Sequence, residues 1–236
     1  MSRHDTDLRG AVVVMAKAPH EGSAKTRLAA TYPARDVVRL SECLLLDTLT
    51  LVRTLPRVQV AVMCPADDVA DVRSCVPEGT PVVGQTGRGL AAGLVSVFER
   101  FVPDFRHVVA VDSDSPHLPV SILRSAFEQL ERRDLVVGPT EDGGYYLVGA
   151  SAMHPGLFDP ASLGTGGARD ALLARARSLG LSVALTEPWY DVDLPEDLRR
   201  LAAELRIDPG RAPRTAALLA SWGPDPDPGE DGRRDR

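Results

Sequence analysis

Short apolar runs alternate with amphipathic stretches along almost the whole chain. Runs with the composition of β-strands occupy residues 11–15, 58–63, 81–83, 107–111, 134–137, 145–148 and 181–185. Apolar residues recur at helical spacing in the stretches between and after them, at residues 35–55, 90–101, 119–132, 168–179 and 195–205. Because strands that alternate with helices form parallel sheets, the pattern predicts an α/β fold in which helices wrap a mostly parallel sheet.

The chain has 236 residues, enough for one large α/β domain or for two small ones. We expect a single domain over residues 9–222, because the alternation continues almost from end to end without an internal repeat. Residues 1–8 are expected to be disordered. The same expectation holds for residues 223–236, where proline and charged side chains dominate.

The composition excludes several classes of protein. The net charge of −6 argues against DNA or RNA as the main partner, whereas a small anionic substrate stays open. No apolar stretch approaches the roughly 18 residues that span a bilayer, and no hydrophobic signal segment opens the chain, so we expect neither membrane insertion nor export. The three cysteines, Cys43, Cys64 and Cys75, lack metal-ligand spacing, which indicates reduced core thiols of a cytoplasmic protein.

The stretch AKAPHEGSAKTRL follows the first strand-like run and is a candidate phosphate-binding loop. It is not a P-loop, because Ala24 precedes Lys25, and Pro19, which has no N–H to donate, takes the place of the leading glycine. Lys25 and Arg27 still put two fixed positive charges beyond a turn at Gly22, where a polyphosphate could lie. The alternative is that both side chains only solvate a loop.

A second candidate, DSDSPHLP, begins at the end of the strand-like run 107–111. In open α/β sheets, ligands bind beyond the carboxyl ends of strands. Asp112 and Asp114 would place carboxylates there, as a divalent cation bound to a nucleotide polyphosphate requires. The alternative is an Asx turn or a helix cap.

Two further stretches carry polar residues after strand-like runs. In GPTEDGGYYLVG, the residues Asp142, Gly143 and Gly144 predict either a plain hairpin turn or a ligand site, which Tyr145 and Tyr146 would line. In WYDVDLPEDL, Asp191 and Asp193 precede an expected helix. Either carboxylate caps that helix, or it reaches the same metal ion from far along the chain.

These stretches, AKAPHEGSAKTRLA, DSDSPHLP, GPTEDGGYYLVG and DVDLPEDL, resemble a bacterial family of glycosyltransferase-like and phospholactate-guanylyltransferase-like proteins. The resemblance extends over about residues 12–198. It implies the nucleotide-diphospho-sugar transferase fold, also called GT-A, a three-layer, Rossmann-like α/β architecture with a mixed, mostly parallel sheet. Sugar-nucleotide pyrophosphorylases, molybdenum-cofactor guanylyltransferases and many glycosyltransferases share this fold.

The resemblance also assigns roles to residues. Lys25 and Arg27 contact a triphosphate. Asp114 holds Mg²⁺ or Mn²⁺, with Asp193 or its neighbour Asp191 as the distal ligand, whereas Asp112 stands where many relatives have glycine. The remaining expected contacts are with the nucleotide, by Ala16, Lys17, Gly22, Gly89 and Leu90, and with the acceptor, by Asp142, Gly143, Gly144 and Tyr145.

The chain departs from this family pattern in two places. Many members carry an Asp and an Arg around positions 89 and 93, and a Trp-Ser-Thr stretch where this chain has LGTGG. The first change favours the phospholactate-guanylyltransferase pattern, and the second removes an acceptor contact. Both leave the acceptor open.

The leading hypothesis is a Mg²⁺- or Mn²⁺-dependent nucleotidyltransferase. It would join the nucleotide of a nucleoside triphosphate to a small, phosphorylated, anionic acceptor and release pyrophosphate. The alternatives are a glycosyltransferase with a nucleotide-sugar donor, and a nucleotide-binding domain without catalysis. Neither nucleic acid nor membrane is an expected partner, and a homodimer stays open.

Overall fold

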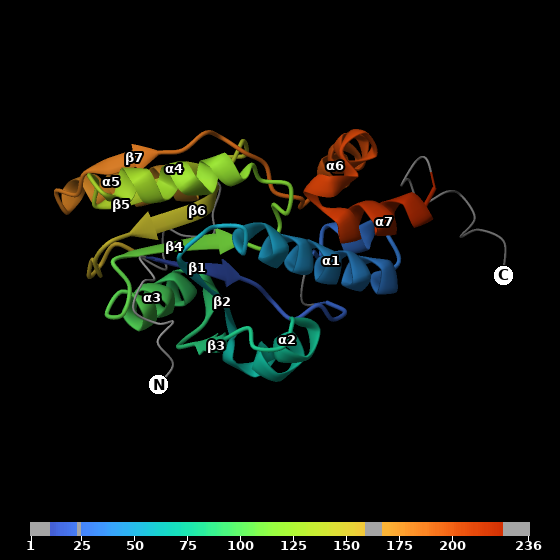
Figure 1. Cartoon of the computed structure of the whole chain (residues 1–236), viewed down its shortest axis with the longest axis horizontal. Coiled ribbons are helices and arrows are strands. Elements are labelled where there is room, and N and C mark those ends of the chain that lie inside the picture. Colours follow the sequence, from blue (N-terminus) through green and yellow to red (C-terminus); the bar gives the residue numbers. More distant parts are fainter. Residues whose placement is uncertain (1–9, 23–24, 159–166, 224–236) are drawn as a thin grey trace.

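The computed structural model describes residues 10–22, 25–158 and 167–223 (Figure 1). In this part of the chain, seven strands form one sheet in the order β3-β2-β1-β4-β6-β5-β7. Their bounds are Gly10–Met15 for β1, Val58–Pro65 for β2, Val82–Gln85 for β3, His107–Asp112 for β4, Leu135–Pro139 for β5, Tyr145–Ala150 for β6 and Val183–Leu185 for β7.

The sheet is mixed and mostly parallel, as the sequence predicts. β1 pairs in parallel with β2 and β4, β2 with β3, and β5 with β7. β6 runs antiparallel to both of its neighbours, β4 and β5. β1 and β4 therefore form a topological switch point, where the chain leaves toward β2 on one side and returns on the other. Ligands of open α/β sheets bind at such points.

Helices cover both faces of the sheet, which confirms the three-layer architecture. α1 (Ala34–Val52), α2 (Val69–Cys75) and α4 (Val120–Leu130) pack on one face, and α3 (Gly89–Phe101) and α5 (Ala168–Ser178) pack on the other. α6 (Pro195–Ile207) and α7 (Pro213–Ser221) lie at one end of the molecule beside α1 (Figure 1). Short 3₁₀ helices occupy Leu28–Ala30, Ala66–Asp68 and Pro209–Arg211.

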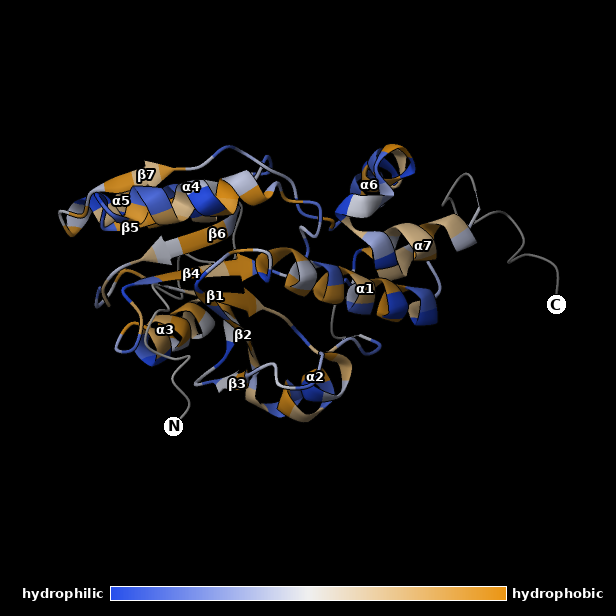
Figure 2. Ribbon diagram, in the orientation of Figure 1, coloured by the Kyte–Doolittle hydropathy of each residue, from blue (hydrophilic) through white to orange (hydrophobic). Residues whose placement is uncertain are grey.

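The central strands are apolar on both faces because both faces are covered. In β1, Val12 and Val14 belong to the core under α1, whereas Ala11 and Val13 belong to the core under α3. Figure 2 shows the strands and the inner sides of the helices as the hydrophobic part of the molecule. A third apolar cluster joins α1 to α6 and α7. Among the described residues, no helix is both long and apolar enough to cross a membrane.

Several predicted boundaries need correction. The helix expected over residues 35–55 ends at Val52, and the strand expected over 181–185 begins at Val183. α2 and α7 were not predicted. Of the three cysteines, only Cys64 is buried, while Cys43 and Cys75 are half-buried, and all three are free thiols. The expectations for residues 1–8 and 224–236, and most of the LGTGG stretch, lie outside the described residues.

Candidate functional site

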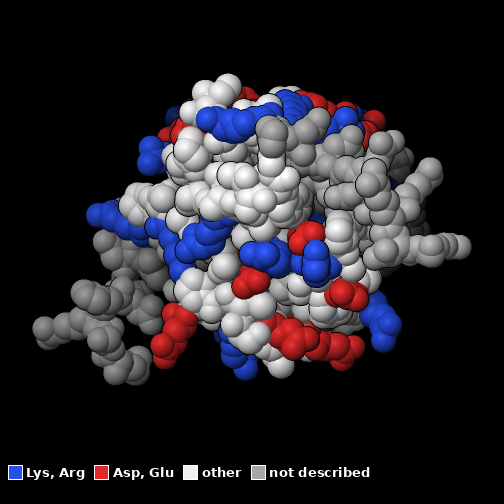
Figure 3. All heavy atoms as spheres, turned by 90° about the vertical axis from the view of Figure 1, so that its right-hand side faces the viewer, with Lys and Arg blue, Asp and Glu red and all other residues white. Residues whose placement is uncertain are grey.

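A pocket of about 510 Å³ opens at the carboxyl ends of β1 to β4. These strand ends contribute Met15, Pro65, Gln85 and Asp112 to its lining. The loop after β1, α1, the start of α3 and the segment before α6 provide further lining residues. Figure 3 views the molecule from the end toward which β1 and β4 point, and it shows basic and acidic side chains next to one another there. The pocket lies where the switch point predicts a ligand site.

A second hollow, of about 600 Å³, lies between α6 and α7, and none of its described lining residues belongs to a strand. Alanine, leucine and proline dominate its lining, and the only charged side chain among its described lining residues is Arg206. Because the hollow brings no carboxylate or other reactive group together, the pocket at the strand ends is the candidate functional site.

Lys25 is the most deeply buried charged residue of this pocket. Its side chain is 3% exposed, and its Nζ lies 2.8 Å from Asp114 Oδ2 and 3.4 Å from Asp193 Oδ1. Nζ also donates a hydrogen bond to the carbonyl oxygen of Val192. Burial acts to lower the pKa of Lys25, but the carboxylates of Asp114, Asp193 and Asp191 outweigh it and raise the pKa above its ordinary value. The ammonium therefore stays charged.

Arg27 contacts one of the same carboxylates, that of Asp193. Its Nη1 lies 3.2 Å from Asp193 Oδ2, and its side chain is 64% exposed. Lys25 and Arg27 thus converge on Asp193 although they come from the other end of the chain. The guanidinium remains accessible to a ligand, which suits a role in holding phosphate oxygens.

Asp112 and Asp114 form a compact turn at the end of β4. Asp112 Oδ1 accepts the Asp114 N–H at 3.0 Å, and Asp112 Oδ2 lies 3.4 Å from the Ser115 hydroxyl. Burial, together with the charges of Asp114 and Asp191, raises the pKa of Asp112 well above its ordinary value. Both residues line the pocket, but the Asp112 carboxylate is hydrogen-bonded within the turn, whereas the Asp114 carboxylate lies beside Lys25.

Asp193 does not cap α6, one of the two roles that the sequence allowed. Asp197 Oδ2 accepts the N–H groups of Asp193, at 3.1 Å, and of Leu194, at 2.7 Å, and so caps the helix from within its first turn. The side chain of Asp193 is thereby free to meet Lys25 and Arg27. Asp191 lies nearby, and burial, followed by the charges of Asp114 and Asp193, raises its pKa to about 6 against the opposing charge of Lys25.

The hairpin turn between β5 and β6 holds the expected acceptor residues. Asp142 Oδ1 accepts the Thr140 hydroxyl at 2.5 Å and the Gly144 N–H at 3.0 Å, and Gly143 adopts φ +92°. These hydrogen bonds from Thr140 and Gly144 lower the pKa of Asp142, and the charge of Arg27 adds to the effect. Asp142, Gly143 and Gly144 do not line the 510 Å³ pocket. Arg27 does line it, and its positive charge acts on the Asp142 carboxylate.

The two tyrosines of the hairpin differ in their surroundings. Tyr146 is buried, and its hydroxyl contacts Thr186 Oγ1 at 2.7 Å and donates to the Glu187 carbonyl oxygen at 2.8 Å. Tyr145 lines a small recess of about 40 Å³, which shares Met15, Leu90 and Asp112 with the main pocket. Tyr146 lines the same recess, so both tyrosines adjoin the site, and the Tyr146 hydroxyl is in addition held by Thr186 and Glu187.

Four of the five expected nucleotide contacts line the pocket. They are Ala16, Lys17, Gly89 and Leu90, while Gly22, at φ +77°, does not belong to the lining. Sequence reasoning missed Gln85, whose Nε2 donates to the carbonyl oxygens of Gly87, at 3.1 Å, and Gly89, at 3.2 Å. Its place at the end of β3 is the signal that could have found it, as it also is for Pro65 at the end of β2.

The carboxylates of the pocket fit a divalent cation in a limited way. In the described part of the chain, no group of three or more His, Cys, Asp or Glu is arranged to hold a metal ion. The carboxylates of Asp114 and Asp193 nevertheless both contact the ammonium of Lys25, although they come from different segments of the chain. Mg²⁺ typically takes one or two protein carboxylates and completes its shell with phosphate oxygens and water. The donor set therefore suits a metal that arrives with a polyphosphate.

Comparison with known proteins identifies the family. Residues 48–165 match the model of a family described as uncharacterized proteins conserved in bacteria (DUF2064). The chain belongs to the DUF2064 family. None of the curated proteins is similar enough to match this DUF2064 protein.

Solved structures confirm the GT-A fold of this DUF2064 protein. A candidate nucleotide-diphospho-sugar transferase from Desulfovibrio desulfuricans G20 is 25% identical, with a TM-score of 0.82 over 90% of this chain and 94% of that one. Rv0371c from Mycobacterium tuberculosis H37Rv, in complex with manganese, is 24% identical, with a TM-score of 0.51 over 83% and 98%. CMP:2-keto-3-deoxy-manno-octonic acid synthetase, complexed with CTP, is 12% identical, with a TM-score of 0.53 over 85% and 99%. The DUF2064 protein thus belongs to the GT-A superfamily.

Proposed function

We propose that this DUF2064 protein is a metal-dependent nucleotidyltransferase, which joins the nucleotide of a nucleoside triphosphate to a small phosphorylated acceptor. The convergence of Lys25 and Arg27 with Asp114 and Asp193 in one pocket supports the proposal most strongly. Positive side chains suit the phosphates, and paired carboxylates suit the cation that accompanies them. The structural likeness to a synthetase complexed with CTP agrees with a nucleotide substrate.

In the proposed reaction, an oxygen of the acceptor phosphate attacks the α-phosphorus. The bond from the α-phosphorus to the bridging oxygen breaks, and its electron pair leaves with pyrophosphate. Lys25 and Arg27 would hold the β- and γ-phosphates and neutralise the charge that grows on the leaving group. No general base is needed, because an acceptor phosphate is already ionised near neutral pH. Neither of the two histidines proposed near the site lines the pocket: His117 is buried against Trp189 and Tyr190, and His20 is exposed.

Mg²⁺ or Mn²⁺, held by Asp114 and Asp193, would supply further neutralisation of phosphate charge when bound. Asp112 supports this arrangement indirectly, because its carboxylate fixes the Asp114 backbone. Asp191 is a further candidate ligand next to the same carboxylates. The structure of an M. tuberculosis relative in complex with manganese agrees with divalent metal use.

The rest of the pocket would hold the nucleoside and the acceptor. Gly89 and Leu90 lie at the start of α3, and the carbonyl of Gly89 is fixed by Gln85, so this segment would position the base and ribose. Arg27 lines the pocket, and its positive charge acts on Asp142 in the hairpin turn. The acceptor phosphate would therefore approach from the side of that turn, with Tyr145 near the boundary.

A glycosyltransferase with a nucleotide-sugar donor is the second candidate, because the 25% identical structure from D. desulfuricans is a candidate nucleotide-diphospho-sugar transferase. Such an enzyme would use an Asp-x-Asp pair on a diphosphate. Here the Asp112 carboxylate is hydrogen-bonded within the turn, and two positively charged side chains, Lys25 and Arg27, contact Asp193. Both features favour a triphosphate, and hence nucleotidyl transfer.

Product analysis tests the proposal. The protein is incubated with each nucleoside triphosphate, a panel of phosphorylated acceptors and Mg²⁺ or Mn²⁺, and separately with nucleotide sugars. Release of pyrophosphate in the first reaction supports nucleotidyl transfer, and release of a nucleoside diphosphate in the second supports glycosyl transfer instead. Asp114→Asn is the matched control, since it keeps the size of the side chain and removes its charge.

A further inference from the structure

The ammonium of Lys25 occupies the position between carboxylates at which a cation would bind. Its Nζ lies within 3.4 Å of oxygens from both Asp114 and Asp193 and also meets the Val192 carbonyl oxygen. The Lys25 side chain is only 3% exposed, so water does not screen the ammonium from a second positive charge nearby. A divalent cation that bound both carboxylates would lie almost in contact with this ammonium.

We infer that the Lys25 ammonium and a divalent cation exclude each other between Asp114 and Asp193, so that the nucleotide-free protein binds the metal weakly. A bound triphosphate offers Lys25 another anionic partner, which frees the two carboxylates for the metal. Metal and nucleotide then strengthen each other's binding, since coupling between two ligands is reciprocal. This inference rests on the proposed function and adds a binding order to it.

The backbone at Lys25 agrees with an ammonium that can be released. Lys25 adopts φ +54°, a left-handed conformation that residues with a side chain rarely take. The Lys25 carbonyl oxygen accepts the Ala29 N–H at 3.0 Å, so the backbone conformation is held by a main-chain hydrogen bond as well as by the side-chain contacts. The long, flexible stem of lysine allows the charged group to move several ångströms without a change elsewhere.

Binding of Mn²⁺ alone to the full-length protein tests the inference. The electron paramagnetic resonance signal of free Mn²⁺ gives the affinity without nucleotide. Lys25→Met removes the charge but keeps an unbranched side chain, and we expect it to bind Mn²⁺ at least about tenfold more tightly than the wild type. Equal or weaker binding by this variant would overturn the inference.

Arg27→Met is the matched control. It removes one positive charge from the same carboxylate, Asp193, but from an exposed side chain that does not lie between the two acids. Water screens its charge, so the affinity for Mn²⁺ should change by less than about threefold. An increase as large as that of Lys25→Met would mean that general charge, not occupancy of the position, governs metal binding, and would overturn the inference.

The wild type provides a test that does not depend on the folding of a variant. Carbon-13 at the ε position of lysine reports each ammonium by nuclear magnetic resonance during a titration with Mg²⁺. The Lys25 signal should shift as Mg²⁺ binds. Saturation of the site with an unchanged Lys25 signal would contradict the exclusion.

The two proposals fail in different ways. If Lys25→Met gains affinity for Mn²⁺ but the wild type releases no pyrophosphate from any nucleoside triphosphate, the exclusion stands and the nucleotidyl transfer fails. If the wild type releases pyrophosphate but Lys25→Met gains no affinity for Mn²⁺, the reaction stands and the exclusion fails.

Discussion

The ammonium of Lys25 lies 2.8 Å from the carboxylate of Asp114 and connects the loop after β1 to the end of β4. Sheet topology creates this pair, because β1 and β4 are parallel neighbours and Met15 is in register with Asp112. Residues that follow the two strands therefore emerge side by side. The segment before α6 completes the cluster, since the Val192 N–H donates to the Asp114 carbonyl oxygen at 3.1 Å.

Asp114→Asn should reduce the rate of pyrophosphate release by a factor on the order of 10² to 10³, because the site loses the charge that would balance metal and ammonium. Steady-state kinetics with the best nucleoside triphosphate measures this. The fold should stay intact, because the Asp114 side chain is 32% exposed. Circular dichroism checks this. Near-normal turnover in the variant would remove Asp114 from the catalytic set.

Gln85→Met should weaken nucleotide binding about tenfold and leave the rate at saturation nearly unchanged. The variant loses two donors, so the carbonyls of Gly87 and Gly89 are no longer fixed at the start of α3. Calorimetry with a non-hydrolysable triphosphate gives the affinity. Gln59→Met is the control, because Gln59 is half-buried on β2, lies outside the pocket lining and donates to the carbonyl oxygen of its neighbour Val60. Equal effects of both variants would refute a role for Gln85 in the pocket.

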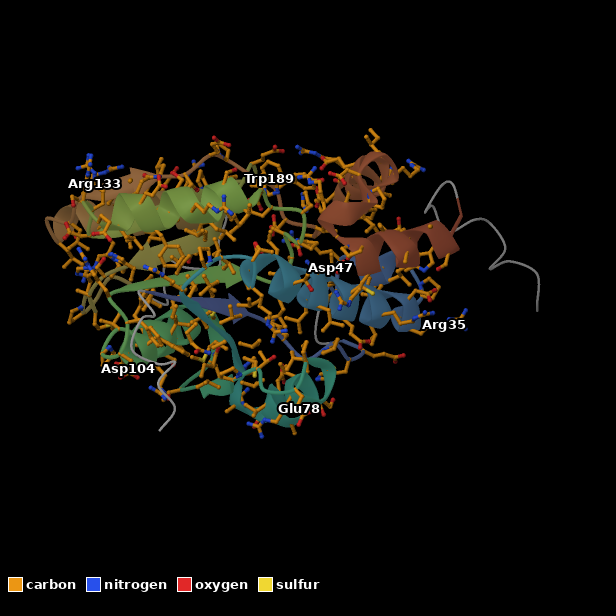
Figure 4. All side chains as sticks on the ribbon, viewed as in Figure 1. Arg35, Asp47, Glu78, Asp104, Arg133 and Trp189 are labelled. Carbon is orange, nitrogen blue, oxygen red and sulfur yellow. The ribbon has the colours of Figure 1, made fainter. Side chains whose placement is uncertain are left out.

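Asp47→Ala should lower the free energy of unfolding by about 2–3 kcal/mol. Asp47 lies on α1 beside α7 (Figure 4) and is fully buried, where it accepts the Thr215 N–H at 2.8 Å and the Thr215 hydroxyl at 2.9 Å. It thus caps the first turn of α7 and fastens that helix to α1. Urea denaturation measures the loss. Glu42→Ala, a half-buried change on the same helix, should cost less than about 1 kcal/mol, and a loss as large as that of Asp47→Ala would speak against the capping role.

His117 should make the fold sensitive to acid. Burial, with the charges of Arg211 and Arg200, lowers the pKa of His117 from 6.5 to about 3, while Trp189 (Figure 4) donates its indole N–H to His117 Nε2 at 3.1 Å. Between these values the unfolded chain binds a proton that the folded protein does not. The contribution of His117 to stability should therefore fall by about 1.4 kcal/mol for each pH unit between about 6 and about 3.

Comparison with His117→Gln isolates this effect, because glutamine keeps an acceptor for Trp189 but does not titrate. Urea denaturation at pH 7, 6, 5 and 4 should show the wild type losing stability relative to the variant on acidification. A constant difference between the two proteins over that range would show that His117 is not the group responsible.

The alternation of strand-like and helical stretches made the sheet predictable. One helix that was missed, α7, is fixed by contacts between distant parts of the chain. The seven strand-like runs correspond to the seven observed strands because the central strands are buried on both faces, so apolar residues dominate their sequences. α7 was missed although Pro213 at its first turn and the Ala and Leu residues after it favour a helix. Its N-terminal cap comes from Asp47, which is distant in sequence. Such a cap cannot be read from a local pattern.

The site was predictable as a set of residues but not as a geometry. Position after a strand identified Lys25, Arg27 and Asp114, and all three meet at the pocket. That Asp197, and not Asp193, caps α6 depends on a rotamer within one helical turn. The sequence also did not reveal that Lys25 would itself occupy the position between the carboxylates, because Asp114 and Asp193 meet Lys25 only through the tertiary fold.

The most direct test of the account is the anomalous scattering of Mn²⁺ in crystals grown with a non-hydrolysable nucleoside triphosphate. The account predicts one manganese peak in contact with Asp114 and Asp193, with Lys25 and Arg27 on the phosphates. A nucleotide bound elsewhere, or a bound nucleotide with the contact between Lys25 and Asp114 unchanged and no manganese beside it, would contradict the account.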